Sequence, residues 1–327
     1  MTKGYQQSFG ELPTLAKAKY DQLFSGVDSV VLMDVPDYAN AGDSAIFLGL
    51  LNYLEAAGIE VTGAYSRGTM SHKAIKNADV VAFLGGGSFG GLSPESDELR
   101  LWVAANMKIG SLLIQCPQSV VFTSTERQND IAQALLKPKN FRFAARDIAS
   151  QELLKSAGLE SKLVPDSSHF LNLQSASNVT RGKIVYLVRE DGESTGNHID
   201  TIDSKWNQDS FNLKISRGVR LLGRYSERLA TRVNPTVDEW KSIAQARLNR
   251  ALAQIGDAEI VVTNRLHGML LSRMSGKPVV YFDNTNRKLT AYMQTWMRDN
   301  DGVIQATDVN MAEFIAQDLI GKDVGGH

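Results

Sequence analysis

An arginine and a histidine stand two residues apart in the segment Asn264-Arg265-Leu266-His267-Gly268, and both side chains can act on an anionic substrate. The guanidinium of Arg265 is permanently cationic and can bind a carboxylate or a phosphate through two parallel hydrogen bonds. The imidazole of His267 can exchange a proton near neutral pH. The pair therefore predicts an anion-binding group beside an acid–base group. The structural alternative is that Arg265 caps a neighbouring helix and His267 is a packed helix residue.

The flanking sequence places this pair where substrates bind. Residues 260–262 form an apolar run typical of a buried parallel strand, residues 269–274 are helical in pattern, and residues 279–282 predict the next strand. In strand–helix–strand units the loop after a strand faces the ligand crevice, and the helix N-terminus that follows favours anions. Arg189 ends the strand-like run 183–188 of the same predicted sheet. It is therefore a second candidate contact for the anion.

A polar cluster follows the first strand-like run of the chain, residues 29–33, and includes Asp37, Asn40 and Asp43. Asp43 or Ser44 can cap the helix that follows by accepting hydrogen bonds from its free N–H groups. Capping explains one polar residue but not three. Carboxylates and amides at the carboxyl end of a strand suit sugar hydroxyls or a general base, and the choice between Asp37 and Asp43 stays open.

A glycine-rich segment, GGGSFGG at residues 85–91, follows the strand-like run 80–84. Gly85, Gly87 and Gly90 match the dinucleotide pattern GxGxxG, but the next strand has no Asp or Glu at its end to hold a ribose. Residues without Cβ atoms let backbone N–H groups approach a ligand closely. We therefore expect Gly86, Gly87 and Ser88 to contact a ligand, and the alternative is a tight turn between a strand and a helix.

Alternating strand and helix patterns predict an α/β fold. Residues 167–181 are polar and aperiodic, which indicates a linker between two Rossmann-like domains, 1–175 and 176–327, with parallel sheets facing a central cleft. The first domain has strand-like runs at 29–33, 60–64, 80–84, 112–115, 141–144 and 162–164, and helical stretches at 44–57, 94–107, 127–136 and 148–157. The second has strand-like runs at 183–188, 259–262 and 279–282, and a long helical stretch at 238–254.

Composition excludes several classes of protein. The 327 residues carry 35 basic and 36 acidic side chains, so the net charge gives no support to nucleic-acid binding. The single cysteine, Cys116, excludes an intrachain disulfide and a multi-cysteine metal site. The N-terminal segment has no apolar region of the signal-peptide type, and no apolar run is long enough to span a bilayer. We therefore expect a cytoplasmic protein.

Five arginines recur at spacings of three and four residues, at positions 217, 220, 224, 228 and 232. If residues 215–232 form one helix, these arginines make a basic stripe beside apolar residues. Such a stripe can touch anionic membrane lipid or a diphosphate-linked acceptor. The alternative is an ordinary solvated helix face.

Taken in order, these motifs resemble those of the polysaccharide pyruvyl transferase family. They are the Asn-Ala-Gly-Asp loop at residues 40–43, the triple glycine at 85–87, Pro165-Asp166, the strand ending at Arg189, and the segment from Arg265 to His267. The resemblance implies a fold similar to GT-B glycosyltransferases. It also implies transfer of pyruvate from phosphoenolpyruvate (PEP) to two hydroxyls of one sugar, which yields a cyclic ketal and phosphate. Residues 190–233 match no pattern of the family.

By position, the resemblance implies a C-terminal donor domain and an N-terminal acceptor domain. PEP would contact Arg265, Leu266, His267 and Arg189, and the acceptor sugar would contact Asn40, Asp43, Gly86, Gly87 and Ser88. Protonation of PEP by His267 and a general base at Asp37 or Asp43 would complete the chemistry. No metal and no cofactor is implied, since PEP is a co-substrate. A lipid-diphosphate-linked acceptor and peripheral contact with the inner membrane surface are further hypotheses.

Other functions compete with this interpretation. The nearest is a GT-B-type glycosyltransferase that uses a nucleotide sugar, with its phosphates at the glycine-rich segment or near Arg265. An NAD-dependent oxidoreductase is disfavoured because the acid that would hold the ribose is missing. A non-catalytic protein that binds anionic sugars or phosphates is the third alternative.

Overall fold

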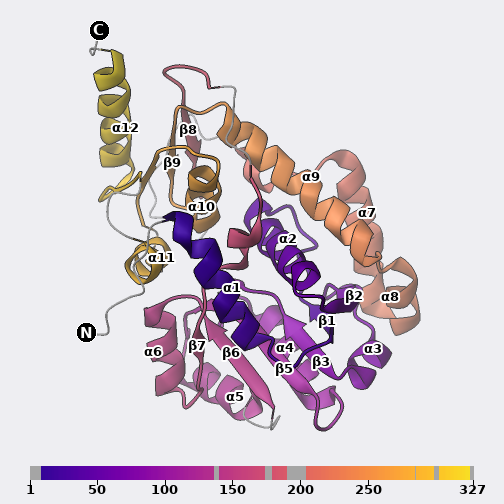
Figure 1. The fold of residues 1–327 in the computed structure, drawn as a ribbon. Coiled ribbons are helices and arrows are strands. Elements are labelled where there is room, and N and C mark those ends of the chain that lie inside the picture. The colour runs from indigo at the N-terminus through magenta and orange to yellow at the C-terminus, as the bar shows by residue number, and fades with distance from the viewer. Residues whose placement is uncertain are drawn as a thin grey trace.

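The structure, a computed structural model, describes residues 9–135, 140–173, 179–189, 204–283, 285–297 and 302–324. In these residues the chain forms two parallel β-sheets surrounded by helices (Figure 1). The first sheet has seven strands, in the order β2-β1-β3-β5-β6-β7, with β4 also paired to β5. The second has four strands, in the order β11-β10-β9-β8. The sequence-based prediction of an α/β fold with two Rossmann-like parallel sheets is confirmed.

The first half of the chain builds the larger sheet and most of its covering helices. Its strands are β1 (Ser29–Met33), β2 (Glu60–Tyr65), β3 (Val80–Phe83), β4 (Gly86–Phe89), β5 (Leu112–Val120), β6 (Phe141–Ala145) and β7 (Lys162–Leu163). Its helices are α1 (Leu12–Leu23), α2 (Ala41–Ala56), α3 (His72–Asn77), α4 (Pro94–Asn106), α5 (Thr125–Leu135) and α6 (Ile148–Ser156), with 3-10 turns η1 (Phe9–Glu11) and η2 (Ser167–Phe170).

The second half builds the smaller sheet and several helices that reach back to the first. Its strands are β8 (Ile184–Leu187), β9 (Ile260–Thr263), β10 (Val279–Tyr281) and β11 (Val303–Gln305). Its helices are α7 (Phe211–Leu221), α8 (Glu227–Val233), α9 (Val237–Gly256), α10 (Leu266–Met274), α11 (Lys288–Trp296) and α12 (Val309–Val324), with 3-10 turns η3 (Ser204–Asn207) and η4 (Leu222–Tyr225).

The two halves share one large hydrophobic core. Helix α9 runs beside α2 (Figure 1), and the indole N–H of Trp240 donates to the carbonyl of Ala64 at 3.1 Å. Helix α11 packs on α6, and the indole N–H of Trp296 donates to the carbonyl of Arg146 at 2.7 Å. Sheet membership thus changes between β7 and β8, near the predicted boundary, while the core continues across it. The division into domains 1–175 and 176–327 stays a prediction.

The start of the predicted linker is core rather than linker, which corrects that part of the prediction. Turn η2 is packed against α2, where the hydroxyl of Ser167 donates to the carbonyl of Ile46 at 2.8 Å. Gly49 is required there, because a Cβ at this position would lie 2.0 Å from the carbonyl oxygen of Ser167. The polar residues that suggest a linker instead form local hydrogen bonds; for example, the Ser168 N–H donates to the carboxylate of Asp166.

The single helix over residues 215–232 on which a basic stripe would depend is not formed. The chain forms α7, then η4, then α8. Gly223 lies in the turn against Gly68, whose carbonyl oxygen would be 2.1 Å from a Cβ at position 223. The arginines consequently do not share one face, and Arg220 is buried.

Candidate active site

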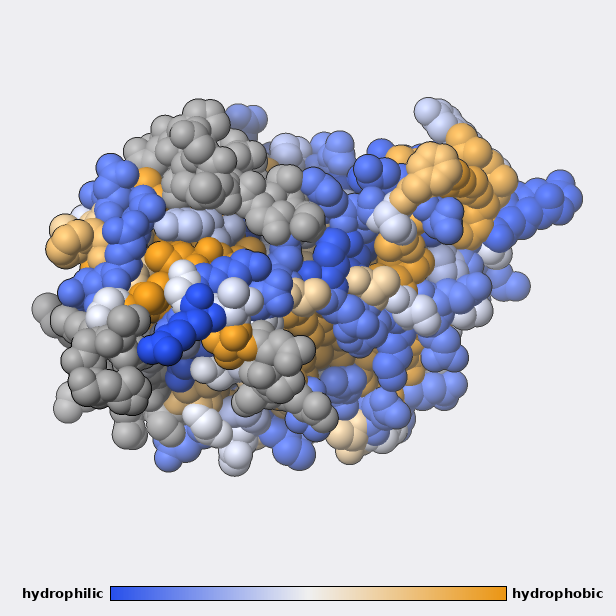
Figure 2. Space-filling view, turned by 90° about the horizontal axis from the view of Figure 1, so that it is seen from above, coloured by the Kyte–Doolittle hydropathy of each residue, from blue (hydrophilic) through white to orange (hydrophobic). Residues whose placement is uncertain are grey.

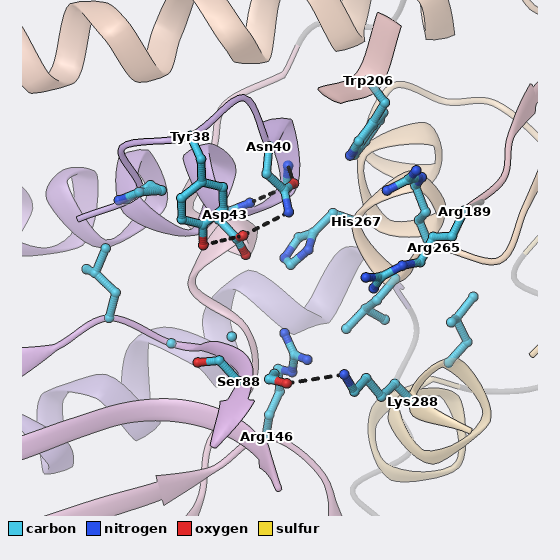
Figure 3. Close-up of a pocket in the computed structure, with 18 of the residues that line it drawn as sticks. Tyr38, Asn40, Asp43, Ser88, Arg146, Arg189, Trp206, Arg265, His267 and Lys288 are labelled. Atoms are coloured by element: carbon cyan, nitrogen blue, oxygen red, sulfur yellow. Dashed lines mark hydrogen bonds between the residues drawn. The ribbon is translucent and has the colours of Figure 1, made fainter. Parts of the chain in front are cut away.

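A cavity of about 190 Å³ opens between the two sheets, at the carboxyl ends of their strands (Figure 3). This is the position at which open parallel sheets bind ligands, because the loops after neighbouring strands converge there. Its lining comes from the loops after β1, β3, β6, β8 and β9, together with η3 and the start of α11. The lining residues are Asp34, Pro36, Tyr38, Asn40, Gly42, Asp43, Leu84, Gly85, Gly86, Gly87, Ser88, Arg146, Arg189, Trp206, Asn264, Arg265, Leu266, His267, Lys288 and Leu289.

One side of the cavity, here termed the cationic wall, consists of Arg146, Arg189, Arg265 and Lys288 (Figure 3). Each comes from a different element of the fold. Arg265 donates from Nη2 to the carbonyl of Val188 at 3.3 Å, and Lys288 donates from Nζ to the carbonyl of Gly87 at 3.2 Å. Both acceptors are neutral carbonyl oxygens, which hold the cationic groups at the cavity.

Asn264 and Trp206 position the arginines of the cationic wall. Asn264 is buried and accepts from the backbone N–H of Arg189 at 2.7 Å, which joins the loops after β8 and β9. The guanidinium of Arg265 lies 6.0 Å from the centre of the Trp206 ring, within the range of a cation–π contact. Both contacts restrict where the two arginine side chains can point.

His267 lies in the first turn of α10 and contacts Asp166 from the first half of the chain. Its Nε2 is 3.3 Å from Oδ2 of Asp166, and Arg146 donates from Nη1 to the same oxygen at 3.0 Å. Burial would raise the pKa of Asp166, but His267, Arg146 and the Ser168 N–H outweigh it and hold that pKa well below its usual range. Asp166 is therefore a carboxylate that orients both His267 and Arg146.

Gly42 allows the histidine to approach the start of α2. A Cβ at this position would lie 2.8 Å from Nδ1 and 2.9 Å from Cβ of His267, closer than real contacts of this kind. The N-termini of α2 and α10 therefore meet at the cavity, as Figure 3 shows for Asn40 and His267. This contact explains why the predicted Asn-Ala-Gly-Asp loop carries glycine at its third position.

The opposite side, here termed the polar wall, consists of Asp34, Tyr38, Asn40 and Asp43. Oδ2 of Asp43 accepts from the Tyr38 hydroxyl and from Nδ2 of Asn40, both at 2.8 Å. Asn40 also caps α2, since its Oδ1 accepts from the backbone N–H of Gly42 at 2.8 Å. Burial of the hydroxyl and the charge of Asp43 raise the pKa of Tyr38 well above its usual value, so this hydroxyl remains a hydrogen-bond donor.

The glycine-rich segment forms strand β4 between the two walls. Gly86 has φ +146°, a conformation that favours glycine. A Cβ at Gly87 would lie 3.1 Å from Nζ of Lys288 and 3.3 Å from Nη2 of Arg146, so the missing side chain makes room for two cations. Ser88 accepts from the buried Arg100 at 3.3 Å.

The cavity brings together all the predicted site residues except one. Those lining it are Asn40, Asp43, Gly86, Gly87, Ser88, Arg189, Arg265, Leu266 and His267. Asp37 does not line it, because Arg220 binds its carboxylate with three hydrogen bonds of 2.6–3.0 Å. Of the two candidate bases, only Asp43 faces the cavity, so the assignment of Asp37 as a catalytic residue is corrected.

Several lining residues escaped the sequence analysis. Arg146 directly follows a strand-like run, so the rule that selected Arg189 could have found it. Tyr38 stands inside the polar cluster and could have been included with it. Lys288 begins a helix after an irregular loop, and Trp206 lies in a segment without pattern, so neither had a recognisable signal. Asp166, from the Pro165-Asp166 motif, does not itself line the cavity, but it contacts His267 across it and caps the turn η2.

Two further findings concern the described residues as a whole. No group of three or more His, Cys, Asp or Glu side chains among them is arranged to hold a metal ion. None of their helices combines the length and the apolar character needed to cross a membrane.

Comparison with known proteins gives matches over most of the chain. Residues 40–286 match the family described as polysaccharide pyruvyl transferase. Pyruvyl transferase 1 of Schizosaccharomyces pombe is 28% identical over 88% of this chain and 75% of its own length. General stress protein 30 of Bacillus subtilis is 25% identical over 90% of this chain and 84% of its own length. A crystal structure of an uncharacterized Klebsiella pneumoniae protein, 20% identical, shares the fold with a TM-score of 0.57, covering 90% of this chain and 99% of that one.

Proposed function

The chain belongs to the polysaccharide pyruvyl transferase family, and we propose that it transfers pyruvate from PEP to two hydroxyls of one sugar, with release of phosphate. The observation that carries this proposal is the division of one cavity into a cationic wall and a polar wall, with His267 between them (Figure 3). Such a division suits a donor with two anionic groups and a neutral polyol acceptor.

The cationic wall suits PEP because this donor carries a phosphate and a carboxylate on one carbon, C2. Charge-assisted hydrogen bonds to such groups are about twice as strong as neutral ones, and an arginine fork matches the geometry of either group. Arg265 and Arg189 come from the loops after neighbouring strands, so they can bind two anionic groups of one small molecule. Lys288 and Arg146 add charge on the side of Gly87.

His267 is suited to start the reaction by donating a proton. Protonation of C3 of PEP makes C2 electrophilic, and a positioned acid near the cationic wall is needed for this step. The carboxylate of Asp166 contacts Nε2 of His267 and fixes the orientation of the ring, as in other histidine–carboxylate pairs. The low pKa of Asp166 keeps this carboxylate charged at neutral pH.

The polar wall is suited to hold the acceptor. A sugar hydroxyl attacks C2, and Asp43 can take up its proton through the carboxylate that faces the cavity. The C2–O bond to phosphate breaks, and the second hydroxyl attacks C2 to close the ketal. Of the two hydroxyl protons, one balances the proton given to C3 and the other leaves with phosphate. Two C–O bonds therefore form, and one breaks.

A thermal-shift titration tests the donor assignment, with PEP, a UDP-sugar and NAD as parallel ligands. A ligand that binds only the folded state raises the melting temperature by mass action. We expect a rise with PEP alone, and loss of that rise in Arg265→Gln. A shift with the UDP-sugar and none with PEP would transfer the proposal to a nucleotide-sugar glycosyltransferase.

A further inference from the structure

Helix α7 exposes apolar side chains to solvent and turns arginine side chains toward the protein, the reverse of an ordinary surface helix. Phe211, Ile215 and Val219 repeat at helical spacing and are 75%, 52% and 47% exposed. Figure 2 shows the resulting apolar surface at its right-hand upper end, where α7 lies. Arg217 and Arg220 point from the same helix toward the protein. A helix normally buries its apolar side, so the reversed arrangement of α7 needs an explanation. Arg220 is bound by Asp37, whereas Nε of Arg217 is buried without a partner.

Arg217 of α7 and Arg224 of the turn η4 line a second cavity next to the first. It is lined by Asp34, Val35, Asp37, Tyr38, Ser66, Arg67, Gly68, Arg217, Leu221 and Arg224, and we term it the arginine pocket. Its volume is about 30 Å³. Asp34 and Tyr38 also line the larger cavity, so the two spaces meet at the polar wall.

The acidic residues of the arginine pocket are already paired with other cations. Asp37 is bound by Arg220, and Asp34 lies 3.7 Å from Nη2 of the buried Arg100. Arg67 forms an ion pair with Glu95 outside the pocket. The acids of the pocket therefore do not neutralise its two remaining arginines.

Arg217 and Arg224 are the cations left over. Neither side chain forms a hydrogen bond or an ion pair with another residue in the described part of the chain. Nε of Arg217 is buried without a partner, and Arg224 is exposed. An unsatisfied buried donor on a charged group is costly, and a bound anion would satisfy it. The two cations favour an anionic group such as a phosphate, and the small cavity leaves no room for a second sugar ring.

We propose that the arginine pocket binds a phosphate group of the acceptor, linked to the sugar that lies at the polar wall. The inference rests on the proposed function, because it places the acceptor sugar in the larger cavity. Arg217 and Arg224 provide the charge-assisted hydrogen bonds, and Tyr38 separates the phosphate from the reacting hydroxyls. The acceptor class is thus a sugar phosphate or diphosphate, either soluble or carried by a membrane lipid.

Calorimetric titration of inorganic pyrophosphate into protein saturated with PEP tests this site, because PEP occupies the cationic wall. The double variant Arg217→Gln/Arg224→Gln should raise the dissociation constant for pyrophosphate about tenfold or more. Arg228→Gln is the matched control, because Arg228 is exposed on α8, lines neither cavity, and removes the same type of charge. Affinity for PEP should be equal in all these proteins.

Pyrophosphate affinity that is equal in the wild type and the double variant, or absent from PEP-saturated wild type, would overturn the proposal. Failure of PEP itself to bind would be a separate result against the proposed function. The pyrophosphate titration can then be run without PEP on an Arg265→Gln background, with the same expectation.

Sedimentation with vesicles distinguishes the two sources of phosphate. Vesicles of phosphatidylcholine with phosphatidylglycerol are compared with vesicles of phosphatidylcholine alone. Binding that needs the anionic lipid and is lost in the double variant supports the proposal with a membrane-borne acceptor. Absence of vesicle binding, together with the expected pyrophosphate result, supports it with a soluble sugar phosphate.

Discussion

The two walls of the cavity are built in different ways. The polar wall is one loop, in which Tyr38, Asn40 and Asp43 bond to one another within six residues of sequence. The cationic wall takes its four side chains from four separate elements, and those of Arg146, Arg265 and Lys288 are held on Asp166 and on two carbonyls. The polar wall is therefore set by local structure. The cationic wall exists only when both sheets and α11 are in place.

The largest expected effect comes from the histidine between the walls. His267→Asn should lower the turnover number about 10³-fold, the size of a general-acid contribution. The dissociation constant for PEP should stay within about tenfold, because the cations remain. Phosphate release and calorimetry measure the two quantities. Unchanged turnover, or a loss explained by unfolding in a thermal melt, would make His267 a packing residue.

Removal of a cationic side chain from the cationic wall should weaken the binding of the donor, PEP, alone. Arg265→Ala should weaken PEP binding by about 2–3 kcal/mol, since a charge-assisted contact in a partly buried site is lost. Arg273→Ala is a control on the same helix, because this arginine does not line the cavity. An equal PEP dissociation constant in Arg265→Ala and the wild type would remove Arg265 from the site.

The polar wall should show the reverse behaviour. Asp43→Asn keeps the side-chain shape and removes the base, so turnover should fall about 10²-fold while PEP affinity is unchanged. Calorimetry with PEP and an assay of phosphate release give both values. Weakened PEP binding with normal turnover would show that the two walls do not divide donor from acceptor.

The close approach of Gly42 to the His267 ring joins the two walls, and its disruption should have a smaller effect. Gly42→Ala places a Cβ about 3 Å from the His267 ring, so the ring must move and turnover should fall about tenfold. Gly218→Ala is the control, because nothing lies within 4 Å of the added Cβ. Equal turnover in Gly42→Ala and Gly218→Ala would show that the position of the histidine tolerates this shift.

The smallest expected effect concerns the pH dependence of stability. It comes from His169, which is buried in the core behind the walls and does not line the cavity. Burial lowers the pKa of His169 to about 4, against about 6.5 in an unfolded chain. Between these values the unfolded state binds more protons, so the free energy of unfolding rises with pH. It should fall by roughly 2 kcal/mol between pH 7 and pH 5.

Urea unfolding at the two pH values measures this change. His169→Gln removes the titrating group and can keep a hydrogen bond to Tyr292, so its stability should depend less on pH. The same pH dependence in His169→Gln and the wild type would assign it to other groups.

The polar wall comes from one loop and the cationic wall from four separate elements, and this difference determines which site residues the sequence could predict. Strand and helix periodicity gave both sheets, and the rule that ligands bind after parallel strands selected Arg265, His267, Arg189 and Asp43. Lys288 could not be found in this way, because it reaches the cavity through the packing of α11 on α6. Asp37 was misassigned because its pairing with Arg220 depends on where α7 docks, which local sequence does not specify.

A crystal structure of the complex with PEP tests the division of the cavity most directly. We expect the phosphate and carboxylate of PEP to lie on Arg189, Arg265 and Lys288, with C3 facing His267 and the polar wall open to a sugar. PEP bound instead on the polar wall or in the arginine pocket, with C3 away from His267, would contradict the assignment of the cationic wall to the donor.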